Sequence, residues 1–197
     1  MTIAIILTVI AGVLAGYFFL PEVFVENTEH ILTAGLCLLL FMVGIDIGRQ
    51  GTVISDIRKN GLRILTVPLF VILGTLAGAA AAALLTGMAL RDSAAVAAGL
   101  GWYSLAPIIL SEYSAQLSAI SFLSNVMREL IAIITIPIVA KYIGYIEACA
   151  PPGAAAMDTC LPLVEKATNS TTAVYSFVSG LVLSCVIPVL VPAIMSL

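Results

Sequence analysis

Charged residues are scarce in this sequence. Asp, Glu, Lys and Arg together make up 10% of its 197 residues, against roughly 25% in an ordinary soluble domain. No basic cluster is interleaved with aromatic residues, so nothing supports nucleic-acid binding, and no nucleotide-binding motif supports ATP hydrolysis. Hydrophobic residues account for 61% of the chain. This composition predicts an integral membrane protein.

The residue types that bind metals and cofactors are also scarce. The four cysteines show no CxxC spacing and lie in or beside apolar runs, which favours reduced cysteines that pack as small hydrophobes. The single histidine, His30, sits next to Glu29 at a predicted helix boundary and has no partner at metal-site spacing. The sequence therefore predicts no metal centre and no cofactor.

Long apolar runs fill most of the chain. A helix needs about 20 apolar residues to cross the hydrocarbon core of a bilayer. The first twenty residues contain no Lys or Arg and end without a small-residue cleavage site, so we interpret them as a membrane helix and not as a signal peptide. The fold expected is an all-α, polytopic membrane protein with about seven membrane segments. Those segments are 2–20, 30–48, 62–86, 93–111, 118–143, 152–167 and 171–195.

Basic residues are concentrated in one link between the predicted helices. Residues 49–63 contain four of the eight Lys and Arg residues of the chain. The preceding link, residues 21–30, contains three Glu residues and no Lys or Arg. Positive-inside bias places residues 49–63 in the cytoplasm, together with the N-terminus.

Glycine and proline interrupt two of the apolar segments. Residues 99–107, GLGWYSLAP, include the polar residues Tyr103 and Ser104, and residues 151–162, PPGAAAMDTCLP, include Asp158. Proline removes a backbone donor and glycine loosens a helix, so we expect discontinuous backbone at membrane depth. An acid on such backbone indicates a functional site. The alternative for the first segment is that its Trp-Tyr pair anchors the membrane interface.

The predicted helix 118–143 carries a polar stripe. Asn125 and Glu129 are four residues apart and share a face with Ser121, while Arg128 points about 100° away from Glu129. Such a stripe is typical of a helix that faces a cavity in a bundle. The alternative is a salt bridge at the end of the helix, at the membrane interface.

Other features allow simpler interpretations. The first three predicted helices carry glycines four apart, which would let helices pack closely. Asp46 either pairs with Arg49 near the cytoplasmic interface or takes part in transport. The polar run 169–172 is expected to be a loop, with hydroxyls along a substrate path as the alternative.

Two acids on broken or polar segments favour a transporter and not an enzyme. Exposed backbone groups of broken helices replace the hydration shell of a solute, while Glu129 and Asp158 would hold a cation or exchange protons. An amino acid would use both features. A competing hypothesis is an intramembrane aspartyl hydrolase with Asp46 and Asp158 as a dyad, although the usual Gly-x-Gly-Asp surround is missing.

The same residues carry a resemblance to a known family. The stretches GLGWYSLAPIILSE, NVMRELIAI and AAAMDTCLP resemble motifs of the bacterial LysO-type lysine exporters, and LLLFMVGIDIG is similar to their repeated glycine-containing helix. The resemblance implies export of L-lysine and its analogues across the cytoplasmic membrane, coupled to protons. It also implies roles for Glu129 and Asp158, with Asp46 less secure. Asn125, Arg128, Tyr103 and Ser104 complete the predicted site.

The resemblance also implies that this chain is part of a larger assembly. Longer members of the family begin with an additional set of helices that repeats the first three here. Residues 1–90 would then form a three-helix repeat unit and residues 91–197 a substrate-path region within one transmembrane domain. We therefore expect an inverted-repeat transporter completed by a small membrane protein or by a second copy of the chain. A non-catalytic assembly subunit is the remaining alternative.

Overall fold

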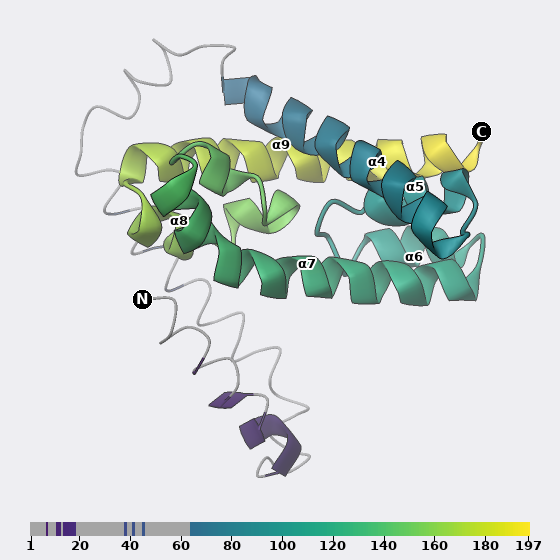
Figure 1. Cartoon of the computed structure of the whole chain (residues 1–197), viewed down its shortest axis with the longest axis horizontal. Coiled ribbons are helices and arrows are strands. Elements are labelled where there is room, and N and C mark those ends of the chain that lie inside the picture. The colour runs from purple at the N-terminus through teal and green to yellow at the C-terminus, as the bar shows by residue number, and fades with distance from the viewer. Residues whose placement is uncertain are drawn as a thin grey trace.

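The computed structural model describes residues 64–197 and, before them, only positions 7, 11–12, 14–18, 38, 41 and 45. Within residues 64–197 every regular element is a helix (Figure 1), which confirms the all-α prediction. The predicted helices 2–20 and 30–48 are not described as continuous elements. Asp46 and the basic link 49–63 lie outside the described residues.

Three helices run the length of the bundle. They are α4 (Thr66–Thr86), α7 (Ala115–Tyr142) and α9 (Ser170–Met195), and each is long and apolar enough to cross a membrane. At about 1.5 Å per residue even the shortest spans about 30 Å, the thickness of the hydrocarbon core. The spans predicted at these three places are confirmed.

Local side chains set where two of these helices begin. The Ser114 hydroxyl accepts a hydrogen bond from Leu117 N at the start of α7, and the Asn169 carboxamide accepts one from Thr172 N at the start of α9. We predicted the polar run 169–172 to be a loop, and this is wrong. Because Asn169 caps the orphan amides of the first turn, the residues after it begin the helix.

The segment predicted as a span at 93–111 is a hairpin instead. Its arms are α5 (Leu90–Ala97) and α6 (Ala106–Ser111), joined by the irregular residues 98–105. The eight residues of α5 reach only about 12 Å, less than half of the hydrocarbon thickness. We call residues 90–111 the first hairpin.

The first hairpin starts and finishes at the same end of the bundle. Met88 precedes it and Tyr113 follows it, and both line one cavity together with Met195 at the C-terminal end of α9. The chain thus enters the bundle at this end, which we call the Met195 end, and leaves at the same end. Interrupted backbone in this segment was predicted, but its return to the same end was not.

The segment predicted at 152–167 is a second hairpin from the opposite end. It consists of two short 3-10 helices, η2 (Glu147–Cys149) and η3 (Gly153–Met157), followed by α8 (Leu161–Ala167). Its first turn lies against the start of α9, where Cys149 Sγ is 3.7 Å from Thr172 O. We call residues 147–167 the second hairpin and this end of the bundle the Ser170 end.

The tips of the two hairpins meet in the middle of the bundle. Ala154 N donates a hydrogen bond of 2.8 Å to Leu100 O. Gly101 and Gly153 have φ angles of +100° and +64°, and a Cβ on Gly101 would lie 2.7 Å from Pro152 O. A Cβ on Gly153 would collide with Leu100 O. Glycine is therefore needed on both sides of this contact, for its φ and for the close approach.

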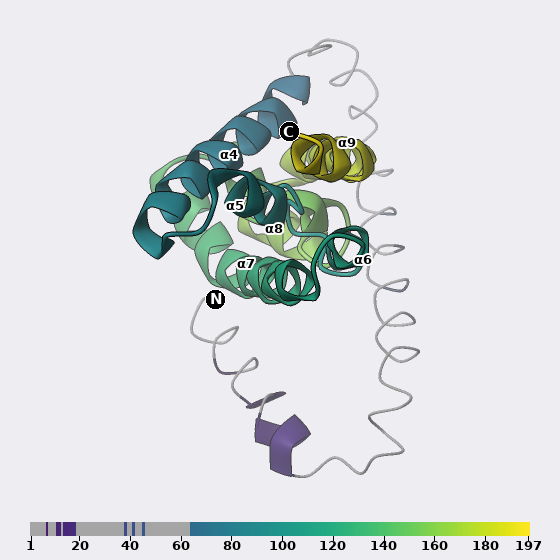
Figure 2. The same ribbon diagram turned by 90° about the vertical axis from the view of Figure 1, so that its right-hand side faces the viewer.

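The long helices surround one arm of each hairpin. Viewed along the bundle, α5 and α8 lie between α4, α7 and α9 (Figure 2). The predicted close packing through Gly74 and Gly78 of α4 is not observed in this part of the chain, because a Cβ on either glycine would meet nothing within 4 Å.

Candidate functional site

A small cavity lies where the two hairpins meet α7 and α9. Its volume is about 80 Å³, and we call it the acidic cavity. The structure brings four of the predicted site residues together on its wall: Tyr103, Ser104, Glu129 and Asp158. The rest of the wall consists of Gly101, Trp102, Ala154, Ala155, Met157, Thr159 and Ser184.

Glu129 reaches the acidic cavity from the middle of α7, and its side chain is half-buried. Its neighbour Arg128 leaves the helix about 100° away and lines a different cavity. Within residues 64–197 the ion pair recorded is Arg91 with Asp92, at 3.5 Å. The alternative of a salt bridge at the end of the helix is not supported, because Glu129 and Arg128 lie in the middle of α7.

Asp158 reaches the same cavity from the second hairpin, directly after η3. Its Oδ1 accepts hydrogen bonds from Thr159 N at 2.6 Å and from Thr159 Oγ1 at 3.4 Å. The Thr159 hydroxyl also interacts with Glu129. Thr159 is therefore hydrogen-bonded to Asp158 and lies beside Glu129.

The neutral side of the acidic cavity comes from the first hairpin. The Tyr103 ring packs edge-on against Phe122 of α7, with ring centroids 6.4 Å apart, and the adjacent Ser104 is exposed. Trp102 and Tyr103 both share the cavity wall with Glu129, which sits at mid-helix. The alternative that these aromatics anchor the membrane interface is therefore not supported.

The acidic cavity has a one-sided charge distribution. Glu129 and Asp158 line it, and its lining contains no Lys, Arg or His. The charges of the two carboxylates act on each other and on the Tyr103 hydroxyl. Two neighbouring carboxylates repel each other unless a proton or a cation lies between them.

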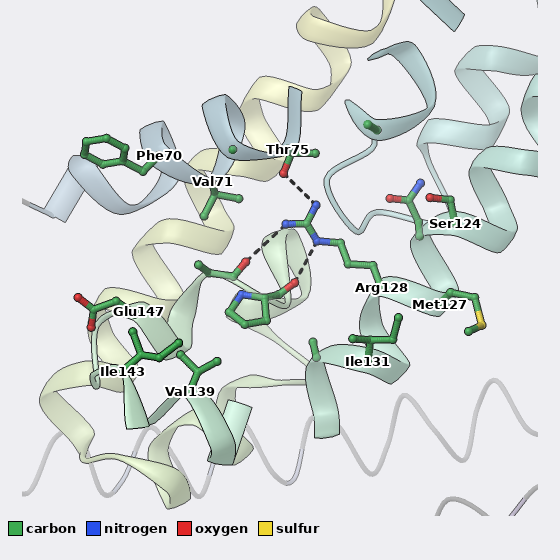
Figure 3. Close-up of a pocket in the computed structure, with 16 residues that line it drawn as sticks. Phe70, Val71, Thr75, Ser124, Met127, Arg128, Ile131, Val139, Ile143 and Glu147 are labelled. Carbon is green, nitrogen blue, oxygen red and sulfur yellow. Dashed lines mark hydrogen bonds between the residues drawn. The ribbon is translucent and has the colours of Figure 1, made fainter. Parts of the chain in front are cut away.

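Asn125 and Arg128, also predicted as site residues, do not line the acidic cavity. Both line a larger groove of about 790 Å³ between α4 and α7, the α4–α7 groove. Figure 3 shows the Arg128 side chain extending across this groove toward Thr75 of α4 and toward backbone carbonyl groups. Most of the groove wall is aliphatic or aromatic, with Glu147 at one end.

Seven residues of the acidic cavity were not among the predicted site residues, and three of them are Thr159, Met157 and Ser184. Thr159 was next to a predicted residue, and its position directly after Asp158 was the available signal. Met157 and Ser184 carried no signal of their own, because a Met and a Ser are ordinary in apolar segments; the Ser184 hydroxyl lies 3.7 Å from the sulfur of Met157. Asp46 lies outside the described residues, so its predicted roles stay predictions.

The arrangement suits a cation at membrane depth. Paired carboxylates bind an ammonium group through charge-assisted hydrogen bonds, and the Tyr103 and Thr159 hydroxyls add acceptors. A volume of 80 Å³ holds a few water molecules or one ammonium group, whereas sites that enclose a whole ligand occupy roughly 300 Å³ or more.

Comparisons with known proteins agree on one family. The family model described as lysine exporter LysO matches residues 6–195. The chain is 30% identical over 169 residues to the lysine exporter LysO of Escherichia coli, a match that covers 85% of this chain and 56% of that protein. It is 25% identical over 183 residues to a Haemophilus influenzae protein provisionally described as a lysine exporter, with 92% of both chains covered. No solved structure matches the chain.

Proposed function

This chain belongs to the lysine exporter LysO family, and from that premise we propose that it forms the substrate-binding part of a secondary transporter. It exports L-lysine in exchange for protons. The family consists of membrane exporters, its matched relatives are bacterial, and three helices are long and apolar enough to cross a membrane. The chain is accordingly a protein of the bacterial inner membrane.

The observation that carries the proposal is the pairing of Glu129 and Asp158 in a cavity whose lining has no basic residue. Intramembrane acids are costly and mark ion or substrate pathways. The side chain of lysine ends in a cation, so its ammonium group is the part of the substrate that this cavity attracts. Substrate sites between broken helices near the bilayer midplane are usual in secondary transporters.

Proton coupling follows from competition for the same carboxylates. The ammonium group of lysine and a proton each relieve the repulsion between Glu129 and Asp158, and binding of one weakens binding of the other. A cycle in which lysine leaves and a proton enters then needs no further coupling site. Tyr103 and Ser104 complete the wall and contribute neutral hydrogen-bonding groups.

The orientation of the chain in the membrane follows from the distribution of basic residues. Lys141 at the end of α7 and Lys166 at the end of α8 lie toward the Ser170 end, as does the start of α4, which the basic link 49–63 precedes. At the Met195 end, Arg91 is paired with Asp92. Positive-inside bias places the Ser170 end in the cytoplasm, so the second hairpin enters from the cytoplasm and the first from outside.

A second chain completes the transporter in this proposal. The chain spans 56% of the length of the E. coli relative, whereas the H. influenzae relative is of similar length to this chain. We propose that a small membrane protein or a second copy of this chain supplies the remaining wall of the path. Efflux measured with this chain alone, and with a co-expressed neighbouring small membrane protein, distinguishes the two arrangements.

Lysine efflux from lysine-loaded cells tests the proposal. Glu129→Gln and Asp158→Asn should each lower the efflux rate about tenfold or more, because a charge-assisted hydrogen bond to the ammonium group is lost. Glu112→Gln is the matched control, since Glu112 is exposed and lies outside the acidic cavity. Wild-type efflux in both cavity variants, at equal amounts of membrane-inserted protein, would end the proposal.

A further inference from the structure

We infer that Asn125 and Arg128 are positioning residues: each holds one hairpin against α7, so that Glu129 and Asp158 line the same cavity. The inference deepens the proposed function. Its transport test rests on that function, whereas its labelling test does not. It assigns both residues to the support of the acidic cavity and not to the substrate itself.

Arg128 binds the second hairpin through backbone oxygens. Its Nε donates to Pro151 O at 3.0 Å, and its Nη2 donates to Ala150 O at 3.5 Å. The remaining nitrogen, Nη1, donates to Thr75 Oγ1 at 3.2 Å (Figure 3). A guanidinium group presents its donors in a rigid planar fork, so these contacts fix its plane. Arg128 thereby joins α7, α4 and the second hairpin.

Asn125 binds the first hairpin in the same way. Its Oδ1 accepts a hydrogen bond of 2.7 Å from Gly101 N, and its Nδ2 donates to Ser121 O at 2.8 Å and to Ser121 Oγ at 3.1 Å. The side chain is buried, and a Cβ on Gly99 would collide with it. Both ends of the carboxamide are therefore engaged, with the tip of the first hairpin packed directly on it.

The spacing of these residues couples the anchors to the acid. Asn125 and Arg128 are three residues apart and lie on one face of α7, and Glu129 is the next residue. The hydrogen bond from Ala154 N to Leu100 O joins the two tips that the anchors hold. A rigid stretch of helix thus sets the position of each hairpin relative to Glu129.

Neither anchor is placed to bind the substrate. Both line the α4–α7 groove and not the acidic cavity. Three of the five N–H donors of the Arg128 guanidinium already bind within the protein, and two of these three bind the second hairpin. A substrate carboxylate that bound the Nε–Nη2 edge would displace Pro151 O and Ala150 O, and α7 would lose its hold on the second hairpin.

Labelling of engineered cysteines tests the anchors without any transport. The probes are Tyr103→Cys on the first hairpin and Thr159→Cys on the second, both at half-buried positions. The background chain has Cys37 and the exposed Cys185 replaced by serine and the buried Cys149 and Cys160 replaced by alanine. Arg128→Gln should speed labelling of the second-hairpin probe about tenfold, and Asn125→Ala should do so for the first-hairpin probe, since each substitution removes the hydrogen bonds that hold one hairpin to α7. Arg128→Lys should restore part of the protection.

Ser124→Ala is the matched control, because Ser124 lines the same groove but is neither anchor. General unfolding would speed labelling of both probes equally with either substitution. The inference is supported only if each substitution speeds labelling of the probe on the hairpin that it releases and not of the other probe. Unchanged labelling with both substitutions, or equal acceleration of both probes, overturns it. If Arg128→Gln is not inserted, Thr75→Val removes one contact of Arg128 and should speed the second-hairpin probe about threefold; no acceleration counts against the inference.

Transport separates positioning from substrate binding. Lysine and 1,5-diaminopentane, which is lysine without its carboxylate, are compared as substrates. Arg128→Gln should lower export of both by the same factor. A selective loss of lysine export would show that Arg128 binds the substrate carboxylate and would overturn the inference. If the unmodified protein exports neither compound, alone or with the co-expressed small membrane protein, the proposed function fails, and the labelling result still decides the role of the anchors.

Discussion

The two hairpins reach the same point from opposite ends of the bundle, yet only the second carries a charge into the acidic cavity. The first contributes Tyr103 and Ser104, and the second contributes Asp158. Both tips depend on a glycine with positive φ. The two hairpins therefore share a glycine with positive φ at the tip and differ in the side chains that they contribute to the acidic cavity.

The hairpins also differ in how they are held. The first is held by Asn125 and by Ser93, whose hydroxyl donates to Ala79 O of α4 at 2.8 Å. The second is held by Arg128 and by Ser176 of α9, whose hydroxyl donates to Ala156 O at 2.8 Å, and it also packs tightly on α9. The hairpin that carries the acid has the stronger, charge-assisted anchor.

The largest expected effect comes from adding a methyl group at a tip. In Gly153→Ala the side chain would collide with Leu100 O and occupy a φ of +64°, so we expect a loss of roughly 3 kcal/mol or more of unfolding free energy. Gly101→Ala, with φ +100°, should be similar. Thermal melting in detergent measures both. Gly78→Ala, in open space, is the control and should melt at or slightly above the wild-type temperature. Wild-type melting of the Gly153 variant would contradict the close contact between the two tips.

The next largest effect should be confined to the second hairpin. In Gly180→Ala the added Cβ would lie 2.6 Å from Met157 N, which forces η3 away from α9 at a cost of about 1–3 kcal/mol. The melting temperature should drop by about 2–4 °C per kcal/mol. In the cysteine-labelling assay, the probe at Thr159 should respond and the probe at Tyr103 should not. Equal responses would mean that the hairpins move together.

A smaller loss of stability is expected from removing the helix caps that follow the two hairpins, Asn169 and Ser114. Asn169→Ala removes a helix cap with a hydrogen bond of 2.8 Å, and we expect a loss of about 1 kcal/mol. Ser114→Ala, after the first hairpin, removes a longer contact of 3.4 Å and should lose less. Denaturation curves of the two variants measure the difference, and the reverse order would argue against these caps.

The smallest effects are expected from the serine anchors. Ser93→Ala and Ser176→Ala each remove one buried hydrogen bond between a hairpin and a long helix. Such bonds contribute about 0.6 kcal/mol on average in membrane proteins. Melting should therefore change by only a degree or two. A shift as large as that of Gly180→Ala would show that a single hydroxyl supports a hairpin.

Much of the fold could be predicted from the hydrophobic composition of the chain and from the positions of its glycine and proline residues. The three long helices follow from their apolar length, and interruptions near Gly99 and Pro151 follow from residues that weaken a helix. The return of each interrupted segment to its own end was not predicted. That return depends on side chains such as Asn125 and Arg128, which form hydrogen bonds with backbone groups near the tips of the hairpins. The spacing of residues in the sequence does not show which backbone group a side chain will contact.

The site was predicted in part for the same reason. Tyr103, Ser104, Glu129 and Asp158 stood out because polar residues are rare in this chain, and the structure brings them to one cavity. Asn125 and Arg128 stood out equally, yet they face the backbone of the hairpins. Polarity marks a residue as important but does not distinguish a ligand from an anchor.

The sequence by itself determined that this is a helical membrane protein of the lysine exporter family, with two broken segments and acids at depth. Apolar run length and helix-breaking residues act locally, so they can be recognised along the chain. Only the tertiary structure decided that both broken segments are hairpins, that their tips meet at Leu100 and Ala154, and that Glu129 shares a cavity with Asp158. Those outcomes depend on contacts between residues distant in sequence, which form only when the long helices pack around the hairpins.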